Sequence, residues 1–160
     1  MQTARGIKVL GLGNFVMQDE GIGIHLLNAL QPILPPEIEC LDGGTDGLAL
    51  LGFVESADRL IVLDAIESGG IPGTVVVWRN DEVPLYTTHK LSAHQAGFAE
   101  VLYWANFQER APQEIAVIGI QPEILDWGTE LTENIRKSFP VAVDAALTIL
   151  REWGVNLPLD

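Results

Sequence analysis

Cysteine and histidine, the side chains most often used as nucleophiles and soft metal ligands, are scarce in this sequence. Cys40 is the only cysteine among 160 residues, which excludes an intramolecular disulfide and a metal cluster held by several thiolates. Its neighbours in 38–41 are typical of a short strand, so we interpret the thiol as a small core side chain and not as a nucleophile. Of the three histidines, His25 falls in an expected helix and His89 in an expected loop, where structural or solvent-exposed roles are favoured; His94 is considered below.

Basic residues are also few. The chain has 9 Lys and Arg against 22 Asp and Glu, a formal net charge of −13. Proteins that bind nucleic acids need a basic surface to neutralise phosphates, so this balance argues against that class, and equally against binding to anionic membranes. It favours a neutral or basic partner or a cation, although acidity also serves solubility alone.

Long apolar runs are absent as well. No stretch approaches the length needed to cross a bilayer, and residues 1–5 lead into a strand instead of the apolar core of a secretory signal. We therefore expect a soluble cytoplasmic protein without membrane insertion. With 48% hydrophobic and 19% charged residues, the chain is expected to fold as one domain spanning 1–160.

Strand-like and helix-like patterns alternate along the chain. The expected strands are apolar and short, and they cover 7–10, 38–41, 60–63, 74–78 and 115–120. The expected helices follow caps at Asp46, Ser92 and Thr132 or begin at Ile22, and Pro140 is expected to restart the last one, which ends at Gly154. A glycine-rich turn at 69–73 replaces a helix, which indicates an antiparallel fourth strand at an edge. The pattern predicts an α/β fold, a three-layer α/β/α sandwich around a mostly parallel five-stranded sheet.

The stretch from Gly11 to Gly23 combines glycines with two adjacent acids, Asp19 and Glu20. It begins like a dinucleotide-binding fingerprint, but Val16 replaces the third glycine and the helix begins too late. The phosphate-binding GxxxxGK[ST] loop, the Gly-x-Ser-x-Gly elbow and the HExxH zinc motif do not occur. The acidic pair therefore indicates cation binding rather than phosphate binding.

Acids follow each of the first three expected strands: Glu20, Asp42 and Asp64, while His94 lies at the start of a later helix. The carboxyl ends of strands in open α/β sheets meet at one edge, where ligands bind. Glu20, Asp64 and His94 would hold a divalent metal there and leave a coordination position open. Carboxylate and imidazole ligands suit zinc, nickel, iron or manganese.

Each candidate also has a purely structural interpretation. Asp19 or Glu20 could complement the dipole of the following helix, and His94 could be a surface or capping residue. Asp42 could hydrogen-bond locally within a turn. Asp64 is harder to explain in this way, because a carboxylate at the end of a buried strand needs a polar or metal partner. The prediction of a metal site rests on the joint placement of Glu20, Asp64 and His94.

Five short motifs, in order and almost from end to end, make the sequence resemble the nickel–iron hydrogenase maturation endopeptidases. They are Gly11-Leu12-Gly13-Asn14 with Asp19-Glu20-Gly21-Ile22-Gly23, Asp42-Gly43-Gly44-Thr45-Asp46-Gly47, Leu63-Asp64-Ala65-Ile66, Ser92-Ala93-His94-Gln95 and Ile118-Gly119-Ile120-Gln121-Pro122. Each motif is weak alone, and the ordered set is specific. The resemblance implies a phosphorylase/hydrolase-like variant of the predicted fold.

The resemblance also implies a function. Members of this family remove a C-terminal extension from the precursor of the hydrogenase large subunit after nickel has been inserted. Carried over by position, the metal ligands of the family fall on Glu20, Asp64 and His94. Asp42 falls in the segment associated with recognising the substrate and its nickel. Its expected place at a strand end separately motivates a role as general base or substrate contact. Nickel would be supplied by the substrate, and zinc or another divalent ion could be bound in the isolated protein.

Two alternatives from other classes stay open at this point. Peptidyl-tRNA hydrolase-like proteins also begin with a strand followed by Gly-Leu-Gly-Asn, although the net charge of −13 opposes tRNA binding. The protein could also be a non-enzymatic nickel-binding chaperone that holds the large subunit without cutting it.

Overall fold

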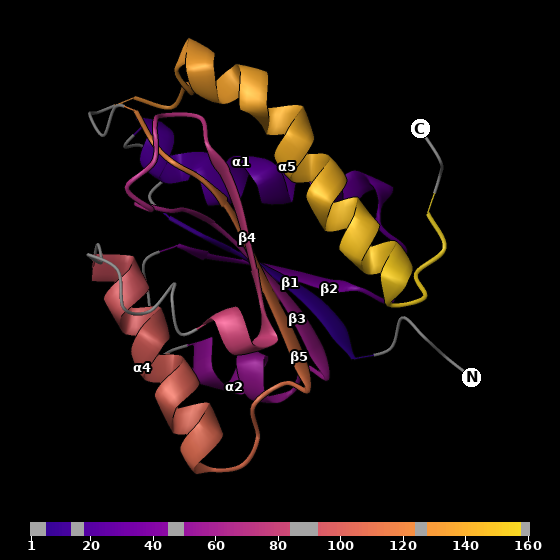
Figure 1. Ribbon diagram of the computed structural model, residues 1–160. Coiled ribbons are helices and arrows are strands. Elements are labelled where there is room, and N and C mark those ends of the chain that lie inside the picture. Colours follow the sequence, from indigo (N-terminus) through magenta and orange to yellow (C-terminus); the bar gives the residue numbers. More distant parts are fainter. Residues whose placement is uncertain (1–5, 14–17, 45–49, 84–92, 124–127, 158–160) are drawn as a thin grey trace.

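A five-stranded sheet forms the middle layer of the protein. The computed structural model describes residues 6–13, 18–44, 50–83, 93–123 and 128–157, and only the backbone of Gln18, Glu20 and 93–97 (Figure 1). The strand order is β2-β1-β3-β5-β4, with β4 antiparallel to β5 and the other pairs parallel. This confirms the mostly parallel sheet and its antiparallel edge strand. The strands are β1 Ile7–Leu12, β2 Glu39–Gly44, β3 Arg59–Ala65, β4 Val75–Arg79 and β5 Glu114–Ile120.

Helices cover both faces of the sheet, which confirms the three-layer prediction. One face carries α1 (Ile22–Leu30) and α5 (Glu133–Glu152), and the other carries α2 (Leu51–Glu55) and α4 (Ala93–Phe107) (Figure 1). Neighbouring strand residues are buried on opposite faces: Ile61 packs in the α1–α5 core, and Val62 packs in the α2–α4 core with Phe98. Burial on both faces explains the uninterrupted apolar runs of the central strands. Short 3-10 helices lie at η1 Gln18–Gly21, η2 Gln31–Ile33 and η4 Asn80–Glu82.

The structure corrects two features of the predicted elements. The first three expected strands end too early, and Asp42 and Asp64 lie inside β2 and β3 rather than beyond them. The predicted restart of the last helix at Pro140 is wrong, because α5 is continuous from Glu133 to Glu152 and contains this proline. Pro140 is exposed, whereas the opposite side of α5 buries a long apolar stripe, and that burial holds the helix together across one missing hydrogen bond.

The end of α5 is otherwise as predicted, with Gly154 at a φ of +92° directly after the C-cap Trp153. The expected caps Asp46 and Ser92 lie outside the described residues. No described helix combines the length and apolar character that a bilayer-spanning segment requires.

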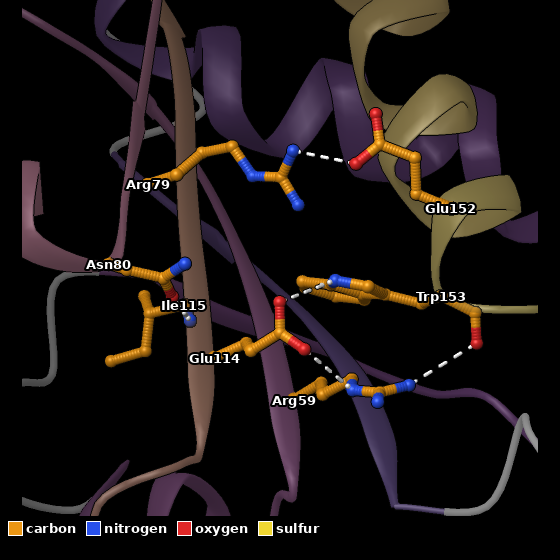
Figure 2. A network of polar contacts seen from close by, with 7 residues as sticks. All are labelled: Arg59, Arg79, Asn80, Glu114, Ile115, Glu152 and Trp153. Atoms are coloured by element: carbon orange, nitrogen blue, oxygen red, sulfur yellow. Dashed lines mark hydrogen bonds and ion pairs between the residues drawn. The ribbon is translucent and has the colours of Figure 1, made fainter.

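A polar network fastens the C-terminal end of α5 to the amino ends of β3 and β5 (Figure 2). The Glu114 carboxylate accepts a hydrogen bond from Trp153 Nε1 at 3.2 Å and pairs with Arg59 Nε at 3.2 Å. Arg59 also donates to the Trp153 carbonyl oxygen at 3.3 Å, and Arg79 pairs with Glu152 at 2.7 Å. These contacts lie at the end of the sheet opposite the carboxyl ends of β3 and β5, so we assign them a structural role.

Candidate functional site

Asp64 is a fully buried carboxylate close to the carboxyl end of β3. Its side chain is 0% exposed, and its Oδ1 accepts a hydrogen bond from the Ala65 backbone N–H at 2.8 Å. Val62 and Ile66 pack in the α2–α4 core, so the alternation along the strand turns Asp64 toward the same layer. A carboxylate taken this far from water needs compensating polar or cationic partners. The predicted desolvation of Asp64 is therefore confirmed, and it is more complete than expected.

Glycines of the first motif allow backbone segments to meet at this edge of the sheet. A Cβ on Gly23 would lie 2.2 Å from the Leu12 carbonyl oxygen and 2.3 Å from that of Leu63. The first turn of α1 therefore lies directly against the ends of β1 and β3, which only glycine permits. Gly13, at a φ of +130°, donates its N–H to the Gly44 carbonyl oxygen at 2.9 Å and joins the first loop to β2. Close packing explains these glycines without any phosphate ligand.

Asp19 connects η1 to Glu123 and Thr132, which lie between β5 and α5. Its side chain is 0% exposed; Oδ1 accepts the Thr132 N–H at 3.0 Å, and Oδ2 accepts the Glu123 N–H and the Thr132 hydroxyl, each at 2.9 Å. Thr132 occupies the N-cap of α5 as predicted, but its side chain bonds Asp19 and does not cap the helix. Close by in sequence, His25 Nε2 lies 3.1 Å from the Thr129 carbonyl oxygen. These contacts hold η1 against the chain that leaves β5 and enters α5.

Burial shifts the pKa of two side chains near these elements. Desolvation lowers the pKa of His25, and the Thr129 carbonyl and the Asp19 charge oppose this effect in part. Desolvation and, to a smaller extent, the charge of Glu39 raise the pKa of Cys40, which disfavours the thiolate. Cys40 lies half-buried in β2 against the core, which supports its interpretation as a packing residue.

Asp42 lies across β1 from Asp64 and leaves the sheet on the other face. Asp42 pairs with Gly11 of β1, the strand between β2 and β3. Cys40 packs in the α1–α5 core, so Asp42, two residues later, points to that side, whereas Asp64 points to the α2–α4 side. Asp42 is exposed, and its Oδ1 accepts a hydrogen bond from the Gly44 N–H at 3.0 Å. This is the kind of local hydrogen bond that a purely structural role of Asp42 predicts. The two acids therefore do not point toward a common ligand from the same face.

The backbones of Glu20 and His94 belong to η1 and α4, but their side chains are outside the described set. Glu20 lies in η1 directly before α1, and His94 is the second residue of α4. Among the side chains that the structure describes, no three His, Cys, Asp or Glu form a metal-binding group. That set omits Glu20 and His94, so the three-residue site stays a prediction. His89 also lies outside the described residues.

Gln121 links the loops after β3 and β5, a contact that sequence reasoning missed. Its buried amide oxygen accepts the Ser68 N–H at 2.8 Å and the Ser68 hydroxyl at 3.2 Å, and its Nε2 donates to Glu67 at 3.1 Å. The only sequence signal was its place in the last motif, directly after an apolar strand. The interaction holds the two loops together beyond the carboxyl ends of β3 and β5, at the end of the sheet where Asp64 lies.

Comparisons with known proteins agree on one family. A family model described as hydrogenase maturation protease matches residues 24–149. The chain is 46% identical to the hydrogenase expression/formation protein HupD of Rhizobium leguminosarum bv. viciae, over 93% of this chain and 76% of that protein. It is 41% identical to the hydrogenase 2 maturation protease of Escherichia coli K12, over 94% and 93% respectively.

Solved structures agree. The hydrogenase maturating endopeptidase HybD from E. coli superposes with a TM-score of 0.89 at 39% identity, over 96% of this chain and 97% of that one. The [NiFe] hydrogenase maturation protease HybD from Thermococcus kodakarensis gives a TM-score of 0.74 at 28% identity, over 90% and 98%. With the family model and these identities together, the chain belongs to the hydrogenase maturation proteases.

Proposed function

We propose that this protease removes the C-terminal extension from the precursor of a hydrogenase large subunit once nickel has been inserted. Family membership supplies the reaction class, and the buried Asp64 carboxylate at the carboxyl edge of the sheet is the observation that carries the site. Membership of a protease family also overturns the peptidyl-tRNA hydrolase-like and non-enzymatic chaperone alternatives.

The proposed metal ligands are Glu20, Asp64 and His94. Asp64 faces the layer that contains α4, and α4 carries His94 in its first turn. Glu20 lies in η1, which Gly23 allows to approach the ends of β1 and β3. Two carboxylates and one imidazole suit nickel or zinc and leave coordination positions open for a substrate. We propose that the nickel arrives with the precursor, so that loading of the precursor licenses cleavage.

Asp42 has a separate proposed role. It is exposed, and it leaves the sheet on the face opposite to Asp64. This position suits contact with the substrate chain beside the metal better than ligation of the metal itself, and a general-base role is the second possibility. Asp42→Asn separates the two: loss of a substrate contact raises KM, whereas loss of a general base lowers kcat. A variant with unchanged kcat and KM would exclude both roles.

The function is tested by incubating the purified protein with nickel-loaded and nickel-free precursor and weighing the products by mass spectrometry. We expect cleavage of the loaded precursor alone. Equal cleavage of both forms would contradict licensing by nickel, and stoichiometric zinc with chelator-sensitive activity would indicate a resident zinc ion instead.

The proposed ligands are tested separately with Asp64→Asn and His94→Ala. Asp64→Asn can keep the hydrogen bond from the Ala65 N–H while it removes the charge. We expect both variants to lose cleavage by about 100-fold or more, with unchanged circular dichroism. Normal processing by both would remove the proposed site.

A further inference from the structure

Helix α4 is apolar on two faces, although it covers the sheet with only one. Its inner face packs against the sheet through buried side chains: Phe98, Val101, Leu102 and Ala105. On its outer surface Tyr103, Trp104 and Phe107 are 61%, 38% and 69% exposed. A surface helix normally places polar residues there, so these three rings, which we call the aromatic patch, require another explanation.

The rings of the aromatic patch pack against one another. The Tyr103 and Trp104 centroids are 5.3 Å apart with an edge-on geometry, and Trp104 and Phe107 are 5.6 Å apart, also edge-on. Tyr103 and Phe107 stack at 6.4 Å. The patch is therefore a formed surface and not a set of independent side chains. Exposed apolar patches of this kind mark interaction sites on soluble proteins.

A hollow of about 450 Å³ adjoins the aromatic patch and shares Tyr103 with it. Leu102 and Ile115 supply apolar walls, and among the described lining residues only Asp81 carries a charge. Asn80 Oδ1 accepts the Ile115 N–H at 3.0 Å, which fixes η4 to β5 at the rim (Figure 2). The hollow can therefore receive an apolar side chain or a basic one directed at Asp81.

The patch and hollow lie well away from the proposed metal site. His94 is in the first turn of α4, and Tyr103 and Phe107 follow 9 and 13 residues later, which is about 13 to 20 Å along the helix at 1.5 Å per residue. Figure 1 shows the C-terminal end of α4 descending to the side of the molecule that carries α2, away from the carboxyl edge of the sheet. A folded protein substrate is large enough to contact both ends of this helix, whereas a short peptide is not.

We propose that the aromatic patch and the hollow dock the folded body of the precursor, through a segment in which apolar side chains flank a lysine or arginine. This inference rests on the proposed function and adds a second contact to it. Aromatic residues are enriched among the side chains that dominate binding energy at protein interfaces. Two linked contacts strengthen each other through effective concentration, so docking at α4 favours the correct precursor over other chains.

Charge distinguishes this occupant from a second copy of the protein. In the part of the chain that the structure describes, the exposed acids Glu100 and Glu109 border the patch, Asp81 lines the hollow, and Arg110 is the exposed base that follows them. A symmetric dimer through this face would set these acids against their own copies, between two chains that each carry −13. A partner with a basic and apolar segment matches the surface instead.

The test compares wild-type protein with Tyr103→Gln/Phe107→Gln, with Asp81→Lys and with Val141→Gln. Val141 is 57% exposed on α5, in the opposite layer, and serves as the matched control. Cleavage kinetics on nickel-loaded precursor are measured together with binding of nickel-free precursor by biolayer interferometry. We expect the double variant and Asp81→Lys to raise KM and the dissociation constant by about tenfold, with kcat, the melting temperature and the control unchanged.

Each outcome bears on the proposal. Unchanged KM and binding in both patch variants would overturn it, as would a fall in kcat at constant KM. Sedimentation that shows a wild-type dimer at assay concentration, dissociated by the double variant, would also overturn it in favour of a second copy. If the patch variants bind the precursor more weakly than the wild-type protein does, but the wild-type protein does not cleave it, the docking site stands and only the proposed function is refuted.

Discussion

Replacing Asp19 with alanine should destabilise the protein strongly, even though this acid belongs to none of the proposed metal ligands. Its buried carboxylate accepts three hydrogen bonds of 2.9–3.0 Å, two from backbone N–H groups of Glu123 and Thr132 and one from the Thr132 hydroxyl. The hydroxyl can turn to another acceptor, but the two N–H groups would lose their acceptor. An unsatisfied buried donor costs about 1–3 kcal/mol, but Glu123 is exposed and Thr132 is half-buried, so water can reach the two freed N–H groups and we expect a total loss of about 2–4 kcal/mol.

That loss is a large share of the about 5–15 kcal/mol that stabilises a typical domain. For a chain of this size it should lower the melting temperature by roughly 4–16 °C, at about 2–4 °C per kcal/mol. Asp19→Asn should also destabilise, because either orientation of the amide turns an NH₂ group toward a backbone N–H. Urea denaturation followed by circular dichroism measures both changes.

Two comparisons make the Asp19 result interpretable. Thr132→Val removes only the hydroxyl bond and should cost about 1 kcal/mol, less than Asp19→Ala. Asp144→Asn, an exposed change on α5, should stay within about 0.5 kcal/mol of wild type. If Asp19→Ala is no more destabilising than Asp144→Asn, the three hydrogen bonds do not hold these segments together and the reasoning is refuted.

Three further predictions concern a glycine, a histidine and the network of Figure 2. Gly23→Ala should lower both stability and cleavage, because its Cβ would meet two carbonyl oxygens within 2.3 Å; a fully active, equally stable variant would contradict this packing. An NMR titration should give His25 a pKa below 6.5, because burial disfavours its charged form. His25 then binds fewer protons in the folded state than in the unfolded state, so it lowers the free energy of unfolding as the pH falls below about 6.5. This part of the pH dependence should be absent in His25→Gln. Glu114→Ala should reduce the urea midpoint by weakening the contacts to Arg59 and Trp153 but leave kcat/KM unchanged, and a selective loss of activity would argue against a purely structural network.

The sheet was predictable from the sequence because its central strands, β1, β3 and β5, are short apolar runs buried on both faces. The limits of the strands were less predictable, since Asp42 and Asp64 are charged residues inside β2 and β3. The backbone hydrogen bonds of a strand can continue past a charged residue near its carboxyl end. A prediction that stops each strand at the first charged residue therefore ends the strand too early. The prediction at Pro140 was wrong for a similar reason. A proline alone predicts a break in the helix, but burial of the apolar side of α5 keeps the helix continuous.

The candidate site was predictable only in part. Asp64 follows four apolar residues in the chain, a local signal that correctly indicated a desolvated carboxylate. The partners of Asp19 lie 104 and 113 positions away, and the ties of Gln121 to Glu67 and Ser68 cross more than 50 residues. No periodicity or spacing reports such contacts, because they arise from the crossing of loops at the sheet edge.

The structure gives a definite role to Asp19, the acid of the adjacent pair that is not among the proposed metal ligands. Asp19 lies in η1, directly before Glu20 in the chain. Asp19 points toward Glu123 and Thr132, and both of its carboxylate oxygens accept hydrogen bonds from these residues. These hydrogen bonds hold η1, and with it the backbone of Glu20, in place directly before α1. Under the proposal that Glu20 is a metal ligand, Asp19 is therefore the residue that positions the ligand and not a ligand itself.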